Sequence, residues 1–179
     1  MKLLGFCLLL SHFHLVLEPA DQTALSQFMQ WLLTSHVRRY HKHYGNSGHV
    51  WQGRFKSFPV QRDEHLLTVL RYVLQNPVRA GLSDTVHEWP WSSARRRQLV
   101  DRSPVEEENR LQEQLESRLD EVQVATIREC LNRQRPFGQS EWQAEMASKF
   151  GLNSTLRPRG ARGMKRKVAC PLYDGRPVT

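Results

Sequence analysis

Apolar residues near the N-terminus predict a buried strand. Residues 7–10 are mostly leucine, and residues 12–17 continue the apolar run with alternating side-chain types until Glu18 and Pro19. Successive side chains of a strand point to opposite faces. One face therefore carries His12, His14 and Val16, and the other carries Phe13, Leu15 and Leu17. We expect the second face to be the core face and the first to present two adjacent imidazoles, with the proline ending the strand.

Two later stretches repeat their apolar residues with a helical period. Asp21 is a plausible N-cap for the first, which ends at the glycine-containing residues 45–48. Its periodic residues are Leu25, Phe28, Met29, Leu32, Val37, Tyr40 and Tyr44. The second begins at or just after Asp63, and the Asn76-Pro77 pair is expected to end it. Its buried stripe is Leu66, Leu67, Leu70, Val73 and Leu74.

The C-terminal part of the chain predicts more helix and then a tail. Acidic residues after Ser103-Pro104 favour a helix start, with Leu111, Leu115, Leu119 and Val122 along it. Residues 140–143 are typical of a capping box for a short helix that Gly151 closes. Residues 157–167 combine Arg and Lys with Gly and Pro, so we expect a basic tail that is disordered on its own.

Composition narrows the class of protein. The chain has 179 residues, about one domain's worth, and a net charge of +8. No apolar run approaches the roughly 20 residues that span a bilayer, which excludes an integral membrane protein. Three scattered cysteines favour neither a disulfide framework nor a Cys-based zinc site. Residues 1–10 imitate a signal peptide but lack a small-residue cleavage site, so we expect a cytoplasmic protein and keep export as an alternative.

The charge is unevenly distributed. Residues 1–104 carry 13 basic and 7 acidic side chains, residues 105–150 carry 6 and 10, and residues 151–179 carry 7 and 1. An acidic spacer thus separates a basic body from a basic tail, which suggests two contact surfaces for one polyanion.

Three features could carry chemistry. His12 and His14 share a strand face and could both bind one metal ion, although two surface or packed histidines would have the same pattern. Tyr72 and Asn76 lie one helical turn apart, yet a packing tyrosine beside a helix-ending asparagine is the simpler reading of that pair alone. Aromatic and cationic residues alternate in residues 49–58, where they could stack bases and hold phosphates or form core.

Taken together and in order, these segments resemble the REP-associated tyrosine transposases. These are insertion-sequence, single-tyrosine transposase-like proteins of the His-hydrophobe-His superfamily. The resemblance rests on the segments SHFHLVLEP (11–19), SGHVWQGRFKS (47–57), LRYVLQNPVRAGL (70–82) and WPWSS (89–93). The C-terminal segments RPFG (135–138), EW (141–142) and LNSTLRPRG (152–160) also look like that family's tail.

The resemblance implies a site that nicks and joins DNA with one metal ion. His12, His14 and Asn76 would hold Mg²⁺ or Mn²⁺, and the nitrogen ligands make Mn²⁺ plausible. Tyr72 would attack phosphorus and form a 5′-phosphotyrosine. The implied partners are single-stranded DNA and DNA hairpins of the REP type, with no membrane. Whether the chain forms a homodimer stays open.

Charge and position suggest which cations would contact this DNA. The candidates are Arg38, Arg39, Lys42, Arg54, Lys56, Arg79, Arg157, Arg159 and Arg162. For any one of them a solvated positive face without a specific role is the alternative, and the tail could equally be a solubilising end.

The resemblance also predicts the architecture. We expect an α+β protein with a ferredoxin-like antiparallel sheet and helices on one face. We divide the chain into a catalytic domain (1–98), a helical C-terminal segment (99–151) and the basic tail (152–179). Only eleven residues precede His12, so we expect the first strand and helix to be missing and the strand of His12 to lack its antiparallel partner. The alternative function is therefore an inactive, DNA-binding remnant of such a transposase.

Overall fold

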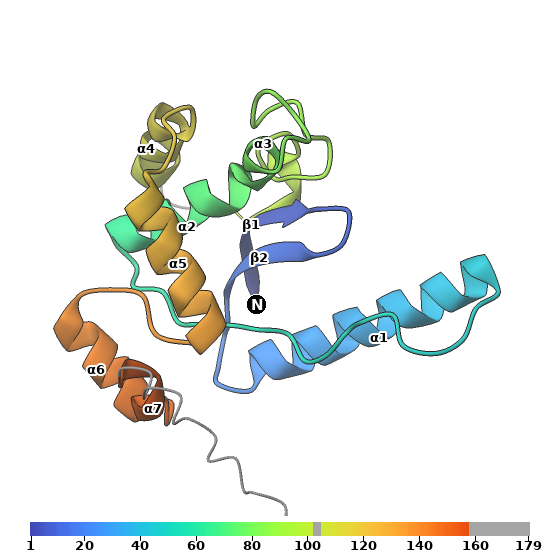
Figure 1. The fold of residues 1–179 in the computed structure, drawn as a ribbon, viewed down its shortest axis with the longest axis horizontal. Coiled ribbons are helices and arrows are strands. Elements are labelled where there is room, and N and C mark those ends of the chain that lie inside the picture. Colours follow the sequence, from blue (N-terminus) through green and yellow to red (C-terminus); the bar gives the residue numbers. More distant parts are fainter. Residues whose placement is uncertain (102–104, 158–179) are drawn as a thin grey trace, which may run out of the picture.

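The protein is an α+β structure, as expected. A computed structural model describes residues 1–101 and 105–157, without the side chains of 105–107. Figure 1 shows a small antiparallel sheet with helices around it. The elements are β1 (Lys2–Leu8), β2 (Phe13–Glu18), α1 (Ala24–Tyr44), α2 (Glu64–Leu74), α3 (Asn76–Arg79), a 3-10 turn η1 (Arg97–Leu99), α4 (Val105–Leu115), α5 (Glu121–Arg133), α6 (Ser140–Lys149) and α7 (Asn153–Leu156).

The strand of the imidazoles has an antiparallel partner, so the expectation that this partner is missing was wrong. β1 pairs with β2, and Cys7 lies opposite His14. The amide of Leu9 donates to the carbonyl of His12 at 2.8 Å, which turns the chain between the strands. Residues 7–10 therefore belong to β1 and this turn rather than to the front half of β2. The turn lacks the Gly or Asn residues that normally mark a hairpin, so the apolar run looked continuous.

The outer edge of β1 is also hydrogen bonded. The amide of Leu8 donates to the carbonyl of Trp91, and the amide of Ser93 donates to that of Phe6. Further along, the amide of Asp101 donates to the carbonyl of Leu3. An irregular segment, residues 91–101, thereby satisfies backbone groups that would otherwise be exposed at a sheet edge.

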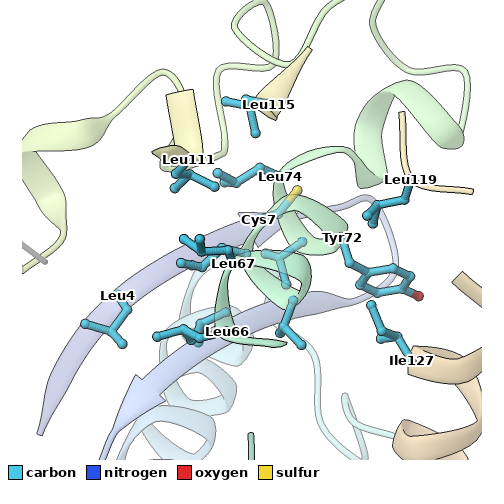
Figure 2. Packing of buried hydrophobic residues seen from close by; sticks show 14 of the residues in the cluster. Leu4, Cys7, Leu66, Leu67, Tyr72, Leu74, Leu111, Leu115, Leu119 and Ile127 are labelled. Carbon is cyan, nitrogen blue, oxygen red and sulfur yellow. The ribbon is translucent and has the colours of Figure 1, made fainter. Parts of the chain in front are cut away.

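α2 is the centre of the core. Asp63 caps it by accepting from the amide of His65, and eight of its 11 residues are buried, including the whole predicted leucine stripe. One side of α2 packs on β1 and β2, and the other meets α4 and α5. Figure 2 shows Leu67, Tyr72 and Leu74 of α2 among Cys7 of β1 and Ile127 of α5. Burial raises the pKa of the Cys7 thiol to about 12, so this cysteine is a packing residue.

The core face of β2 is the face that carries the imidazoles, contrary to expectation. Val16 is the buried residue of β2, whereas Phe13, Leu15 and Leu17 are only half-buried. α2 covers the face of Val16, and the close approach of helix to sheet explains why residue 5 is glycine. A Cβ at Gly5 would lie 2.7 Å from a methyl carbon of Leu70.

α1 confirms the first predicted helix but contributes little to the core. The Asp21 carboxylate accepts from the amides of Thr23 and Ala24, and Gly45 ends the helix in the left-handed conformation. Of the 21 residues of α1, only Met29 is buried. Figure 1 shows this helix extending away from the hairpin and α2, with the following segment running back along it.

The C-terminal helices differ from expectation at two points. The helix predicted over Leu111–Val122 breaks after Leu115, and Val122 on α5 is exposed. The side chain of Gln75 stabilises this break by hydrogen bonding to the backbone there. Its amide nitrogen donates to the carbonyls of Leu115 and Ser117, and its amide oxygen accepts from the backbone N–H of Leu119. The capping box forms at Asp120 and Gln123 of α5, not at residues 140–143, since α6 has Gln139 as its N-cap without a side-chain bond. Within the described residues, no helix is long and apolar enough to cross a membrane.

Candidate active site

Tyr72, Asn76 and Arg79 lie along one helical face. α2 ends at Leu74, two residues before Asn76 of the predicted Asn-Pro stop, but the chain stays helical into α3. The amide of Gln75 donates to the carbonyl of Arg71, and the amide of Arg79 donates to that of Gln75. Pro77 sits in the first turn of α3, where its missing N–H costs nothing. Spacings of four and seven residues therefore bring these three side chains to the same side.

The two imidazoles of the hairpin meet this face. The rings of His12 and His14 are 5.0 Å apart, centroid to centroid, and the His14 ring is 6.0 Å from the ring of Tyr72. His12 is exposed at the start of β2, whereas His14 is half-buried beneath α2. The packing of the Val16 face against α2 brings His14 to Tyr72. The sequence-based prediction had placed the opposite face, that of Phe13, Leu15 and Leu17, in the core.

His14 is held in its neutral form. Burial, the neighbouring His12 and the Arg79 guanidinium lower the pKa of His14 to about 4. At neutral pH its ring nitrogens therefore keep the lone pair that metal binding needs.

Arg79 is the cation of this cluster. Its guanidinium carbon lies 4.7 Å above the centre of the Tyr72 ring, and its Nη2 donates to the carbonyl of Tyr72 at 2.8 Å. Its Nε–H is buried and has no acceptor among the residues that the structure describes. Burial lowers the pKa of Arg79, but an arginine stays charged at neutral pH. One donor of a half-buried cation is thus left for a ligand.

Sequence reasoning named Arg79 only as one of nine surface cations and missed its contact with the tyrosine. Its position seven residues after Tyr72 was the signal that could have revealed it, because residues seven apart on a helix share a face.

Asn76 fits the role of a polar ligand. Its side chain is buried, at 9% exposure, and its amide nitrogen has no hydrogen-bond partner among the described residues. A buried side-chain amide without a hydrogen-bond partner lowers stability unless a ligand supplies the missing interaction. Rotating the amide by 180° exchanges its oxygen and nitrogen, so either atom can face a ligand. Within residues 1–101 and 108–157 no cluster of three His, Cys, Asp or Glu side chains could hold a metal. By donor chemistry alone, two imidazoles and an amide oxygen would suit one divalent ion of the Mn²⁺ type.

The remaining predicted DNA contacts lie in separate places. Arg38, Arg39 and Lys42 are exposed on the C-terminal half of α1, and Arg54 is exposed in the segment after it. Lys56 donates to the side-chain oxygen of Asn132 on α5 at 3.3 Å. Arg157 follows α7, where its carbonyl accepts a hydrogen bond from the guanidinium of Arg133. Arg159 and Arg162 lie outside the described residues.

Comparison with known proteins shows what the N-terminal part is similar to. Residues 1–76 match the family model "Transposase IS200 like". The resemblance to insertion-sequence transposases is thereby confirmed. The IS200-like region spans β1, β2, α1 and α2 and contains His12, His14, Tyr72 and Asn76, whereas Arg79 follows it.

The chain is also similar to a protein described as a transposase. A Haemophilus influenzae protein provisionally described as "REP-associated tyrosine transposase" is 30% identical over 103 residues, which cover 51% of this chain and 58% of that protein. The aligned part is thus little more than half the length of this relative. No solved structure matches the chain.

Proposed function

We propose that this chain nicks and joins single-stranded DNA next to hairpins through a covalent bond to Tyr72. The observation that carries the proposal is the meeting of three chemically distinct groups from three elements: His14 of β2, Tyr72 of α2 and Arg79 of α3. A nucleophile, a neutral metal-binding imidazole and a partly unpaired cation are the parts that phosphoryl transfer needs. The similarity to transposases supports the same reaction class.

Tyr72 is the nucleophile in this proposal. Its phenolic oxygen forms a bond to the scissile phosphorus, the bond from phosphorus to the 3′ oxygen breaks, and that oxygen leaves as a 3′-hydroxyl after taking up a proton. The downstream strand then stays attached to Tyr72 by its 5′ phosphate. Because the phosphodiester energy is retained in the new bond, a 3′-hydroxyl can reverse the reaction and join strands without ATP.

His12, His14 and Asn76 would hold a divalent ion beside the tyrosine. When bound, Mg²⁺ or Mn²⁺ supplies Lewis-acid stabilisation of the negative charge on the phosphate. The protein contributes by keeping His14 neutral through burial, so that this ligand does not have to lose a proton at pH 7. The spare donor of Arg79 lies where a phosphate near Tyr72 would develop charge.

End-labelled DNA tests the covalent step. The full chain is incubated with Mn²⁺ and a hairpin-bearing single strand, and the products are separated on a denaturing gel. A label at the 3′ end should move with the protein, whereas a label at the 5′ end should be released on a shorter strand. Tyr72→Phe, which keeps the buried ring, should abolish the adduct, and Tyr44→Phe on α1 should retain it.

Two results would contradict the proposal. One is a folded wild-type chain that binds DNA but gives no adduct, which would favour the DNA-binding remnant. The other is an adduct that persists in Tyr72→Phe.

Arg79 can be tested in the same assay. Arg79→Gln should slow adduct formation at saturating DNA by about 10²-fold, the usual effect of removing one donor to developing charge. Arg79→Lys should recover part of the rate by restoring the charge. Arg54→Gln, the matched exposed arginine, should change DNA affinity without changing the saturated rate. Equal saturated rates for Arg79→Gln and wild type would remove Arg79 from the site.

A further inference from the structure

α1 carries an aromatic ladder, which we define as His36, Tyr40, Tyr44 and Trp51. The first three recur every four residues, so their rings follow one face of the helix. Ring centroids are 6.1 Å apart for His36 and Tyr40, with planes 28° apart, and 4.6 Å apart for Tyr40 and Tyr44, with planes 46° apart. Trp51 comes from the returning segment and lies 4.9 Å from His36. Tyr44 is 60% exposed and Tyr40 36%, so the outer end of the ladder faces solvent.

The inner end of the ladder packs on the hairpin, on the strand face opposite His14. The Trp51 ring contacts Phe13 at 5.4 Å, and Phe13 is the residue between His12 and His14. At this inner end a hollow of about 320 Å³ is lined by Val37, Gly48, His49, Val50 and Trp51. The indole N–H of Trp51 is buried there without an acceptor among the described residues. A flat ligand with polar edges would match both the apolar lining and the unused donor.

The charge of α1 selects a polyanion as the partner. Its 21 residues contain no Asp or Glu, while Arg38, Arg39 and Lys42 alternate with the rings. None of these cations has a carboxylate partner among the described residues. A second copy docking its own α1 here would bring three more uncompensated cations against them, which is unfavourable. In a nucleic-acid strand, the phosphates can pair with the cations while the flat bases stack on the rings.

We propose that the aromatic ladder and the adjacent cations of α1 form a stacking platform for unpaired bases of single-stranded DNA. A duplex is a poor partner because its bases already stack on one another. The choice of DNA rests on the proposed function, but the stacking itself does not require the reaction at Tyr72.

Oligothymidylate binding without divalent ions tests the platform. Fluorescence anisotropy with a labelled single strand of about 20 nucleotides should show at least about ten-fold weaker binding for Tyr40→Ala/Tyr44→Ala. The Tyr40→Phe/Tyr44→Phe variant should bind like wild type, because it keeps both rings. Phe150→Ala, which removes an exposed ring from the end of α6, is the matched control and should also bind like wild type.

Two further readouts separate stacking from charge. An abasic strand of the same length should bind wild type and the double alanine variant equally, because it offers phosphates without bases. The dependence of affinity on salt should be unchanged in that variant, whereas replacing Arg38, Arg39 and Lys42 by Gln should reduce the slope by about 0.7 per cation.

The platform proposal is contradicted if the double alanine variant binds oligothymidylate with wild-type affinity. It is also contradicted if the variant's affinity for the abasic strand falls as much as its affinity for oligothymidylate. Conversion of a dimer to a monomer by the double variant, with unchanged DNA affinity, would also overturn it and assign the ladder to a protein interface. The proposed function stands apart, because the ladder does not contain Tyr72. If wild type forms no adduct but the double alanine variant still loses base-dependent binding, the platform is supported and only the proposed reaction is contradicted.

Discussion

α1 and α2 are both amphipathic helices that begin beside an aspartate, yet α2 is mostly buried and α1 is mostly exposed. Eight of the 11 residues of α2 are buried, against one of the 21 residues of α1. α2 lies between the hairpin and the C-terminal helices, so its rings and polar groups are held in place on every side. α1 extends away from this core (Figure 1). The side chains of Tyr40, Tyr44 and the three cations of its C-terminal half are exposed.

The difference suits the two proposed tasks. A reacting group must be held within a fraction of an ångström, which a helix packed on all sides can do. A surface that binds many bases of any sequence needs exposed rings and charge rather than rigid packing. Tyr72 sits on the first kind of helix, and Tyr40 and Tyr44 sit on the second.

The largest expected difference is in hydrogen exchange. Amides of residues 38–44 in α1 should exchange at least about a hundred-fold faster than those of residues 67–74 in α2, because few contacts oppose local opening of α1. Mass spectrometry after deuterium labelling measures this directly. Equal protection of the two helices would mean that α1 is covered in solution.

A matched leucine pair tests the packing. Leu67→Ala in α2 should lower the free energy of unfolding by about 2–5 kcal/mol, because Leu67 is 3% exposed in the centre of the core. Leu32→Ala in α1 should cost less than half as much, since Leu32 is only half-buried. Urea denaturation gives both values, and similar losses would contradict the comparison.

A glycine pair tests how closely α2 lies on the sheet. Gly5→Ala should destabilise the protein by about 1–3 kcal/mol through overpacking against Leu70. It should also reduce adduct formation, because any displacement of α2 moves Tyr72 away from His14. Gly53→Ala, where a Cβ would have no neighbour within 4 Å, should leave the thermal midpoint unchanged. An unaffected Gly5→Ala variant would show that α2 can move freely on β1.

The smallest effect concerns the two helix starts. Asp63→Ala should lower global stability by about 1 kcal/mol, because it removes the cap of the central helix. Asp21→Ala should leave global stability unchanged, since α1 can fray without unfolding the core. Urea denaturation at pH 7 compares them.

The Asp63 cap also has a pH signature. Burial tends to raise the pKa of Asp63, but hydrogen bonds from the amide and ring of His65 outweigh it and lower the pKa. A lowered carboxyl pKa contributes stability above the unfolded value of about 3.8 that is lost as pH falls below it. The stability difference between wild type and Asp63→Asn, which retains a capping oxygen, should therefore shrink below pH 4. A constant difference down to pH 3 would contradict this role.

Local patterns predicted α2 better than they predicted the elements packed around it. The leucine stripe of α2 and the Asp63 cap follow from helical period and capping chemistry, which act within one or two turns. The partner of β2 and its core face could not be found this way, because an apolar run on both sides of the turn is compatible with either one strand or two. The break between α4 and α5 depends on Gln75, some 40 residues away in sequence.

By itself the sequence determined α1 and α2, the one-turn spacing of Tyr72 and Asn76, and the excess of positive charge, since these depend on neighbours along the chain. Only the tertiary structure decided which face of β2 meets α2, that Arg79 lies over Tyr72, and that α1 stays uncovered. Each of these depends on which apolar surfaces find a partner, and burial is a property of the whole packed molecule rather than of any segment.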